Sequence, residues 1–121
     1  MSQMANSKPY DLEERTFEFA RAVRGLVKAL PRTPANIEDV KQLVRSSGSV
    51  GANYIEANEA LSKKDFRHRI KIARKEAKEA RYWLRLLDLG DGDEATALRG
   101  SLVGEATELL SILSSIEAKT R

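Results

Sequence analysis

Six cationic residues between positions 67 and 85 follow one another at alternating spacings of four and three. They are Arg67, Lys71, Arg74, Lys78, Arg81 and Arg85. On an α-helix this spacing places all six side chains on one face, over about 27 Å at ~1.5 Å per residue. Lys63, Lys64 and Lys75 lie beside this face. A continuous row of Lys and Arg can neutralise the phosphates of a nucleic acid.

The positive charge of the chain is concentrated in this segment. Residues 63–88 carry ten Lys and Arg against four Asp and Glu, whereas the whole chain has a net charge of only +3. Like charges at i and i+4 repel by roughly 0.2–0.5 kcal/mol per pair, so we expect a negative partner nearby. Two partners remain open, the phosphates of RNA or DNA and acidic residues on a neighbouring helix or subunit, and the third alternative is a solvated face with no partner. Candidates for the second are Glu13, Glu14, Glu18, Glu94, Glu105 and Glu108.

A second group of polar residues lies on or beside faces that are otherwise apolar or small. They are Asn53, Glu56, Glu76 and Glu79. We expect them to form a buried polar network, with Arg45, Arg81 and serine hydroxyls as further donors, because a buried carboxylate needs hydrogen-bond donors. A di-metal carboxylate site is the alternative. Such sites typically use Glu-x-x-His pairs, and the single histidine, His68, has no Glu three residues before it, so we expect no metal.

The stretch SSGSVGANYIE, residues 46–56, places two glycines where the surrounding pattern predicts a helix. Gly48 to Gly51 match the G-x-x-G loop of KH RNA-binding domains, but that loop belongs to a fold with a sheet, and no strand pattern is present here. Each glycine costs a helix roughly 1 kcal/mol relative to alanine. We therefore expect the small residues to let two helices approach closely, and expect Gly100 and Gly104 to repeat this in the last helix.

Four helical segments are predicted, at about residues 11–30, 36–61, 63–89 and 93–118. Asp11, Asn36 and Ser62 are predicted caps, and Pro31 and the GDGD run at 90–93 interrupt the pattern. Short connections between long helices predict an all-α, up-down-up-down four-helix bundle. We expect one domain at residues 10–119, after a disordered N-terminal segment at residues 1–9.

Apolar residues repeat at spacings of three and four along each segment. The second segment offers Ile37, Val40, Leu43, Val44, Val50, Tyr54, Ala57 and Leu61, and the last offers Leu98, Leu102, Ala106, Leu109, Leu113 and Ile116. Further apolar residues, such as Phe17 and Val103, widen these faces beyond what one bundle seam requires. Contiguous exposed apolar surface marks interfaces, so we expect a homo-oligomer.

Two strings, RSSGSVGANYIEANEALSKKDF and IKIARKEAKEARYWLRLL, carry a family resemblance. They resemble the four-helix bundle family of proteins encoded in intervening sequences of bacterial 23S ribosomal RNA genes, a relative of the accessory variability protein of diversity-generating retroelements. The similarity covers about residues 10–115. The resemblance implies a barrel-like homopentamer, with nucleic-acid binding in some relatives, and it implies no catalytic residue.

The rest of the sequence narrows the class of function. The chain has no cysteine, no apolar run near the ~18 residues of a membrane span, and no apolar segment at its N-terminus, so we expect a cytoplasmic protein without membrane contact. No nucleophile–base pair can be assembled, so we expect no enzyme, cofactor or small-molecule substrate. We expect Lys63, Lys64 and the six-residue row to bind RNA or DNA without sequence preference. The alternative is a purely structural assembly module whose cations form salt bridges between subunits.

Overall fold

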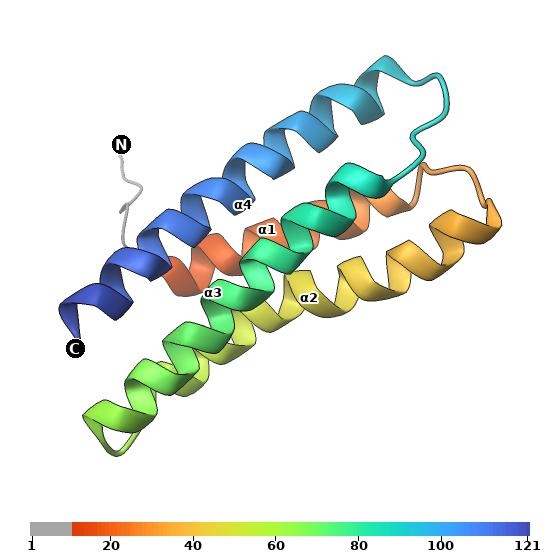
Figure 1. Cartoon of the computed structure of the whole chain (residues 1–121). Coiled ribbons are helices and arrows are strands. Elements are labelled where there is room, and N and C mark those ends of the chain that lie inside the picture. The colour runs from red at the N-terminus through yellow and green to blue at the C-terminus, as the bar shows by residue number, and fades with distance from the viewer. Residues whose placement is uncertain (1–10) are drawn as a thin grey trace.

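The computed structural model describes residues 11–121, which form four helices and no strand. α1 spans Leu12–Val27, α2 spans Pro34–Asn58, α3 spans Lys63–Leu86 and α4 spans Asp93–Lys119. Short connections join each helix to the next, and the chain runs up and down the bundle (Figure 1). The predicted all-α, four-helix fold is confirmed. The disorder expected for residues 1–9 lies outside the described residues.

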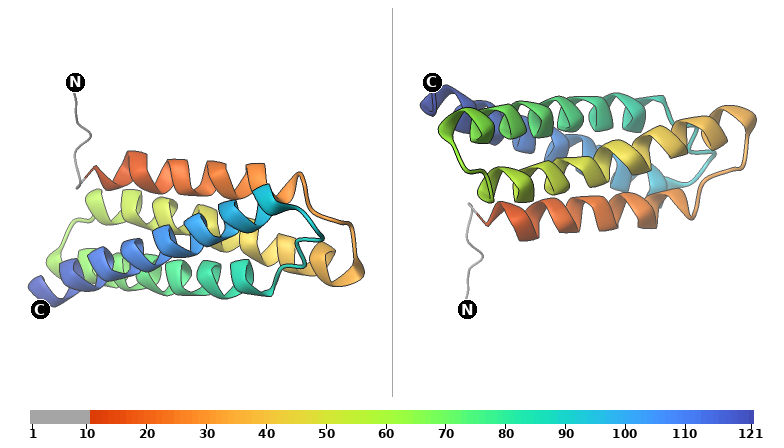
Figure 2. Two further views of the ribbon diagram at one scale, coloured as in Figure 1. Left: turned by 90° about the horizontal axis from the view of Figure 1, so that it is seen from above. Right: turned by 90° about the horizontal axis from the view of Figure 1, so that it is seen from below.

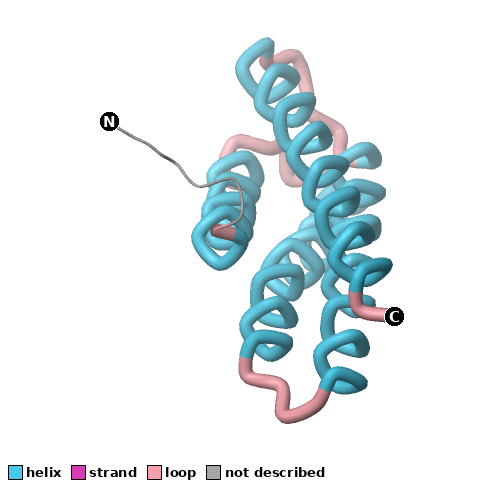
Figure 3. Tube along the Cα trace, turned by 90° about the vertical axis from the view of Figure 1, so that its left-hand side faces the viewer, coloured by secondary structure: helices cyan, strands magenta, loops and turns pink. Residues whose placement is uncertain are grey.

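The helices pack in the cyclic order α1, α2, α3, α4, as the two views in Figure 2 show. The pairs α2–α3 and α3–α4 share the most extensive contacts and α1 and α4 share the sparsest, whereas the two diagonal pairs have no Cα atoms within 8 Å of each other. Figure 3 shows α1 standing to one side of the other helices. The surface of α3 is therefore bordered by α2 and α4 alone.

One ion-pair cluster joins the sparse seam between α1 and α4. The Arg15 guanidinium donates from Nε to Glu105 Oε2 at 2.7 Å and from Nη2 to Glu105 Oε1 at 2.9 Å. The same Nη2 lies 2.7 Å from Glu108 Oε1. The hydrogen bond with Glu105 is the main cause of the raised pKa of Arg15. Glu105 and Glu108, two of the acidic residues expected to neutralise the cationic row, thus pair with Arg15 of α1 instead.

Side-chain caps begin three of the helices. Asp11, Thr33 and Ser62 each accept a hydrogen bond from the backbone N–H three residues later. Thr33 rather than Asn36 caps α2, because Pro34 takes the first helical position, where its missing N–H costs nothing.

Asn36 instead joins two loops at one end of the bundle. Its buried side chain donates from Nδ2 to the carbonyls of Pro31 and Asp88, at 2.9 and 2.8 Å. Its Oδ1 accepts the backbone N–H of Asp88 at 3.0 Å. The amide thus satisfies backbone groups of both the α1–α2 and the α3–α4 connection.

The first three helices end three residues earlier than predicted, at Val27, Asn58 and Leu86. Leu30, Leu87 and Leu89 lie beyond helix ends and are nevertheless buried. Apolar periodicity overestimates the length of α1 and α3, because loop leucines that close the end of the core continue the helical pattern.

The core otherwise follows the predicted apolar faces. Its buried members include Phe19, Val23, Leu43, Val50, Ile70, Ala73, Ala77, Ala80, Leu84, Leu109 and Leu113. The predicted face is wrong at three positions near the ends of helices: Ile37 and Leu98 are exposed, and Leu61 is 98% exposed in the connection to α3.

Gly51 marks a close approach of α2 to α1. A Cβ at this position would lie 2.7 Å from Thr16 Oγ1 and 3.1 Å from Thr16 Cβ. Thr16 is buried, and its hydroxyl already donates to the carbonyl of Leu12 at 2.6 Å, so it has little freedom to move away. This contact agrees with the packing interpretation of the small-residue stretch.

The same interpretation is wrong for Gly100 and Gly104 within this chain. Both are exposed on α4, and nothing lies within 4 Å of the place where a Cβ would stand. No other helix of the described chain approaches α4 at these positions.

The two kinds of glycine predict opposite effects on stability. Gly51→Ala should lower the free energy of unfolding by about 1–3 kcal/mol, because the added methyl group overpacks the α1–α2 contact. Gly104→Ala should raise it by up to ~1 kcal/mol, because the site is open and alanine favours the helix. Urea unfolding of the two variants measures this. Equal effects of the two substitutions would contradict the close contact at Gly51.

Candidate nucleic-acid interface

We give the name basic ridge to six cations on one side of α3: Arg67, Lys71, Arg74, Lys78, Arg81 and Arg85. Lys71, Lys78 and Arg85 are exposed, whereas Arg67, Arg74 and Arg81 are half-buried. The opposite side of α3 packs into the core through its alanine-rich seam. The helix therefore divides into a buried seam and a charged face, as the spacing of its residues predicts.

A groove of about 670 Å³ lies along the ridge where α3 meets α4. The ridge members Lys71, Arg74, Lys78 and Arg81 line it, and α4 contributes Leu110 and Ser114. Lys75 and His68 also line the groove. The α4 side is therefore uncharged at these two positions, and the α3 side supplies the positive charge.

One carboxylate lies beneath the ridge, and sequence reasoning missed it. Glu117, in the last turns of α4, is only 4% exposed at its side chain. Its Oε2 lies 3.7 Å from Arg67 Nη2, and its Oε1 lies 3.8 Å from Arg74 Nη1. Arg121 Nε lies 3.4 Å from the same Oε2. A single negative charge is thus shared among three guanidinium groups.

These cations lower the pKa of Glu117 below its ordinary value of 4.5. The hydrogen bond from Arg121 is the largest cause, and the positive charges of Arg121, Lys71 and Arg74 lower the pKa further, against the opposing effect of burial. Both distances to the ridge arginines exceed those of a direct hydrogen bond. Buried Arg67 Nε has no hydrogen-bond partner among residues 11–121.

The other predicted phosphate contacts have no carboxylate partner in the part of the chain that the structure describes. Lys63, Lys64, Lys71, Lys78 and Arg85 form no ion pair within 4 Å of an acidic group of residues 11–121. Arg81 donates to the Thr107 hydroxyl at 3.2 Å, which leaves its charge uncompensated.

The acidic residues proposed as an internal counter-charge do not meet the ridge within the chain. Glu105 and Glu108 bind Arg15, and Glu18 lies 2.8 Å from Arg21 on its own helix. The counter-charge that α4 does supply is Glu117. The sequence does predict that Glu117 faces the core, because Leu109, Leu113 and Glu117 continue one four-residue spacing on the apolar face of α4.

The predicted polar network divides into two parts on the α2–α3 side. Arg45 Nη1 lies 3.2 Å from Glu76 Oε2, and Arg45 Nη2 lies 3.3 Å from Glu79 Oε1. The hydrogen bond that Arg45 donates to Glu76 is the main cause of the raised pKa of Arg45. Asn53 is not bonded to these carboxylates: its Oδ1 accepts from Arg69 Nη1 at 3.2 Å.

Glu56 lies outside this network, since its side chain is exposed on α2. Glu76 is the more buried of the two glutamates in contact with Arg45, at 13% side-chain exposure against 38% for Glu79. Its Oε1 is buried without a hydrogen-bond partner among the described residues. The network is therefore smaller than predicted and centres on Arg45.

Residues 11–121 contain no group of three or more His, Asp and Glu placed to hold a metal ion. None of the four described helices combines the length and apolar character needed to span a bilayer.

Comparison with known proteins gives a family and a related structure. The model of a family described as 23S rRNA-intervening sequence protein matches residues 9–115. The chain is 35% identical to a Bacteroides thetaiotaomicron VPI-5482 protein of unknown function from the S23 ribosomal protein family, whose crystal structure superimposes with a TM-score of 0.74. The match covers 88% of this chain and 97% of that one. No curated protein matches the chain.

The cluster around Glu117 predicts a pH-dependent contribution to stability. Because its pKa in the folded state lies below 4.5, the ionised carboxylate stabilises the fold above pH 4.5, and this contribution is lost as the pH falls through the lower pKa. Wild type should therefore exceed Glu117→Gln in urea resistance at pH 7, and the gap should narrow as the pH is lowered from 4.5 to 3. Glu56→Gln, an exposed control, should open no such gap. A gap between wild type and Glu117→Gln that is equal at both pH values would contradict the assignment.

Proposed function

The chain belongs to the family of 23S rRNA-intervening sequence proteins, and we propose that it is a non-enzymatic, self-assembling protein that binds RNA or DNA through its basic ridge. The contacts are to phosphates, from Lys63 and Lys64 at the start of α3 and from the ridge that continues along it. The proposal places this activity in the cytoplasm and involves no cofactor.

The charge imbalance at the ridge is the observation that carries the proposal. Within residues 11–121, the buried carboxylate of Glu117 pairs with Arg67 and Arg74, and the other four ridge cations have no carboxylate within 4 Å. Neighbouring ridge cations are three or four residues apart and repel one another. At the exposed Lys71, Lys78 and Arg85, binding of an external polyanion releases counterions and is favourable. The groove beside them gives the polyanion a track between α3 and α4.

The proposed binding is independent of sequence. Lys and Arg side chains that meet phosphates carry no base information. Tyr82, which adjoins the ridge, is an exposed aromatic on which a base could stack. A single ring does not select which base of a nucleic-acid strand it contacts. The physical expectation is therefore one affinity for many sequences.

Exposed apolar side chains support self-assembly. Phe17, Ile55, Tyr82, Leu86 and Leu98 are all exposed on helices of the described chain. A homopentamer, as the family resemblance implies, would repeat the ridge five times. The combined positive field would then exceed that of one chain and attract a polyanion from further away.

Salt dependence tests the phosphate contacts. If the six ridge cations meet phosphates, log K for a single-stranded or duplex RNA should fall with log[salt] at a slope of about −4 to −5. The measurement is fluorescence anisotropy across a salt series, on several unrelated sequences. A flat salt response, or no binding at low salt, would contradict the proposal.

Charge reversal on the ridge separates phosphate contacts from subunit salt bridges. Lys78→Glu and Arg74→Glu should weaken binding to all sequences alike and leave the subunit count unchanged. Lys28→Glu makes the same change in net charge just beyond the end of α1, whose Cα atoms all lie more than 8 Å from those of α3, and should affect binding less. Dissociation of the oligomer by Arg74→Glu would favour the alternative function, a purely structural assembly module.

Glu117 gives a substitution expected to increase affinity. Among residues 11–121, Glu117 is the carboxylate that pairs with Arg67 and Arg74, so Glu117→Gln should raise nucleic-acid affinity at pH 7 and steepen its salt dependence. The anisotropy series on this variant measures both quantities, with Glu56→Gln as the exposed control. Weaker binding by Glu117→Gln would show instead that the carboxylate positions the arginines for the contact.

A further inference from the structure

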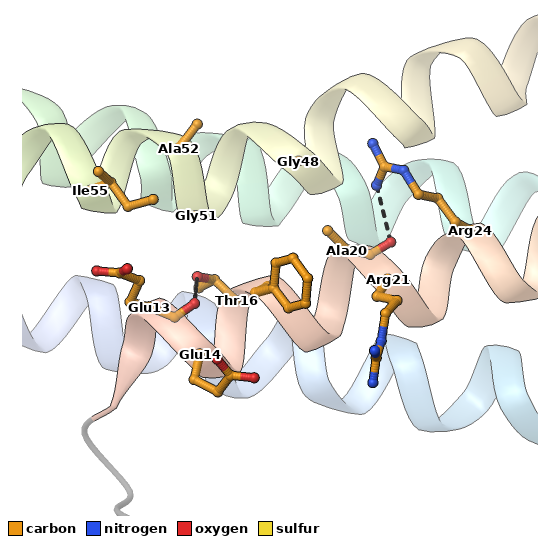
Figure 4. A pocket seen from close by; sticks show the side chains of 11 residues that line it. Glu13, Glu14, Thr16, Ala20, Arg21, Arg24, Gly48, Gly51, Ala52 and Ile55 are labelled. Atoms are coloured by element: carbon orange, nitrogen blue, oxygen red, sulfur yellow. Dashed lines mark hydrogen bonds between the residues drawn. The ribbon is translucent and has the colours of Figure 1, made fainter.

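A second groove lies between α1 and α2, on helices that include no member of the basic ridge (Figure 4). Its volume is about 490 Å³. Gly48, Gly51 and Ala52 supply small residues on the α2 side, and Ala20 lies on the α1 side. The close contact between Gly51 and Thr16 brings the two helices together at this place and leaves the surface beside them hollowed.

Two large apolar side chains line the groove and remain in contact with water. Phe17 of α1 is 57% exposed, and Ile55 of α2 is 43% exposed. The Arg21 guanidinium lies over the Phe17 ring, 5.9 Å from the ring centroid. An exposed aromatic beside an apolar hollow is typical of an interaction surface.

Acidic and basic residues lie at opposite ends of the groove. Glu13 and Glu14 lie at one end of it, near the start of α1, and Arg21 and Arg24 lie towards the other end (Figure 4). Phe17 lies between the two pairs in sequence, four residues after Glu13 and four before Arg21. The surface thus reads as acidic, apolar and basic from one end to the other.

A surface with this pattern is complementary to itself when one copy is turned end to end. We propose that the α1–α2 groove binds the same groove of a second copy about a two-fold axis near Phe17. The acidic end of each copy then meets the basic end of the other, and the two Phe17 rings cover each other's apolar hollow. A two-fold contact of this kind uses the same patch on both partners.

This inference rests on the self-assembly part of the proposed function and names the surface for one of its contacts. A closed ring requires two different patches on each subunit, whereas this contact requires one patch that pairs with itself. It therefore joins two chains, or two rings face to face. The paired contact uses the groove of α1 and α2, whereas the basic ridge lines the groove of α3 and α4, so the ridge stays free to bind nucleic acid in the paired form.

A charge-exchange experiment tests the pairing. One variant, Glu13→Arg with Glu14→Arg, has two basic ends, and the other, Arg21→Glu with Arg24→Glu, has two acidic ends. Each alone should lose the two-fold contact, so its mass should fall to half that of wild type. An equimolar mixture should recover the wild-type mass, because opposite ends meet again. Light scattering coupled to gel filtration, over a concentration series, measures the mass.

Two further measurements keep folding and function separate from pairing. Circular dichroism verifies that each variant is folded, and Phe17→Ser, a change at an exposed residue, gives a second disruption that reverses no charge. Phe17→Ser should also halve the mass. The salt slope of RNA binding should stay unchanged in all of these variants, so that loss of pairing and loss of nucleic-acid binding are distinguishable.

Three outcomes would overturn the inference. A wild type that is monomeric at every concentration has no two-fold contact. If the variants keep the wild-type mass, the groove does not bind a second copy of the chain. A mixture that fails to recover the lost mass rules out the end-to-end arrangement, even if each variant alone dissociates.

Discussion

The positive charge of α3 is the constraint on which the structure and its proposed use depend. The helix buries an alanine-rich seam that lets it lie close to α2 and α4, and the residues that follow the seam at the α4 border are cations. Long Lys and Arg side chains can lie along apolar surface while their charges stay in water, so this arrangement is compatible with a well-packed bundle. It leaves a row of like charges, and within residues 11–121 one carboxylate, that of Glu117, forms ion pairs with this row.

The rest of the charged surface is organised differently. Around α1 and along the α2–α3 seam, acidic and basic groups pair locally, as in the contacts of Arg15 with Glu105 and of Arg45 with Glu76. The first pair joins the sparsely packed α1 and α4, and the second adds to the extensive contact of α2 with α3, so these acidic residues do not neutralise the ridge. The excess positive charge of α3 therefore depends on where the acidic residues lie in the fold as much as on how many the chain has.

The sequence predicts the repetitive parts of this molecule well and its exceptions poorly. Three-four spacing predicts the seam of α3 and the common face of the ridge, because each depends on one helix alone. The role of Asn36, which joins two loops, and the contact of Glu117 with α3 depend on residues far apart in the chain. Gly51 and Gly104 look alike in sequence, yet only the first meets a facing helix.

Whether the ridge is open to an external anion is the central question, and lysine reactivity measures it directly. Brief acetylation of the assembled protein, followed by mass spectrometry, reports the exposure of each lysine with and without RNA. If the ridge is open, Lys71 and Lys78 should react freely in the absence of RNA and be protected by it, while Lys28 and Lys41 should react equally in both conditions. Protection of Lys71 and Lys78 before any RNA is added would show that another subunit already covers the ridge, and the ridge would not be an open nucleic-acid surface.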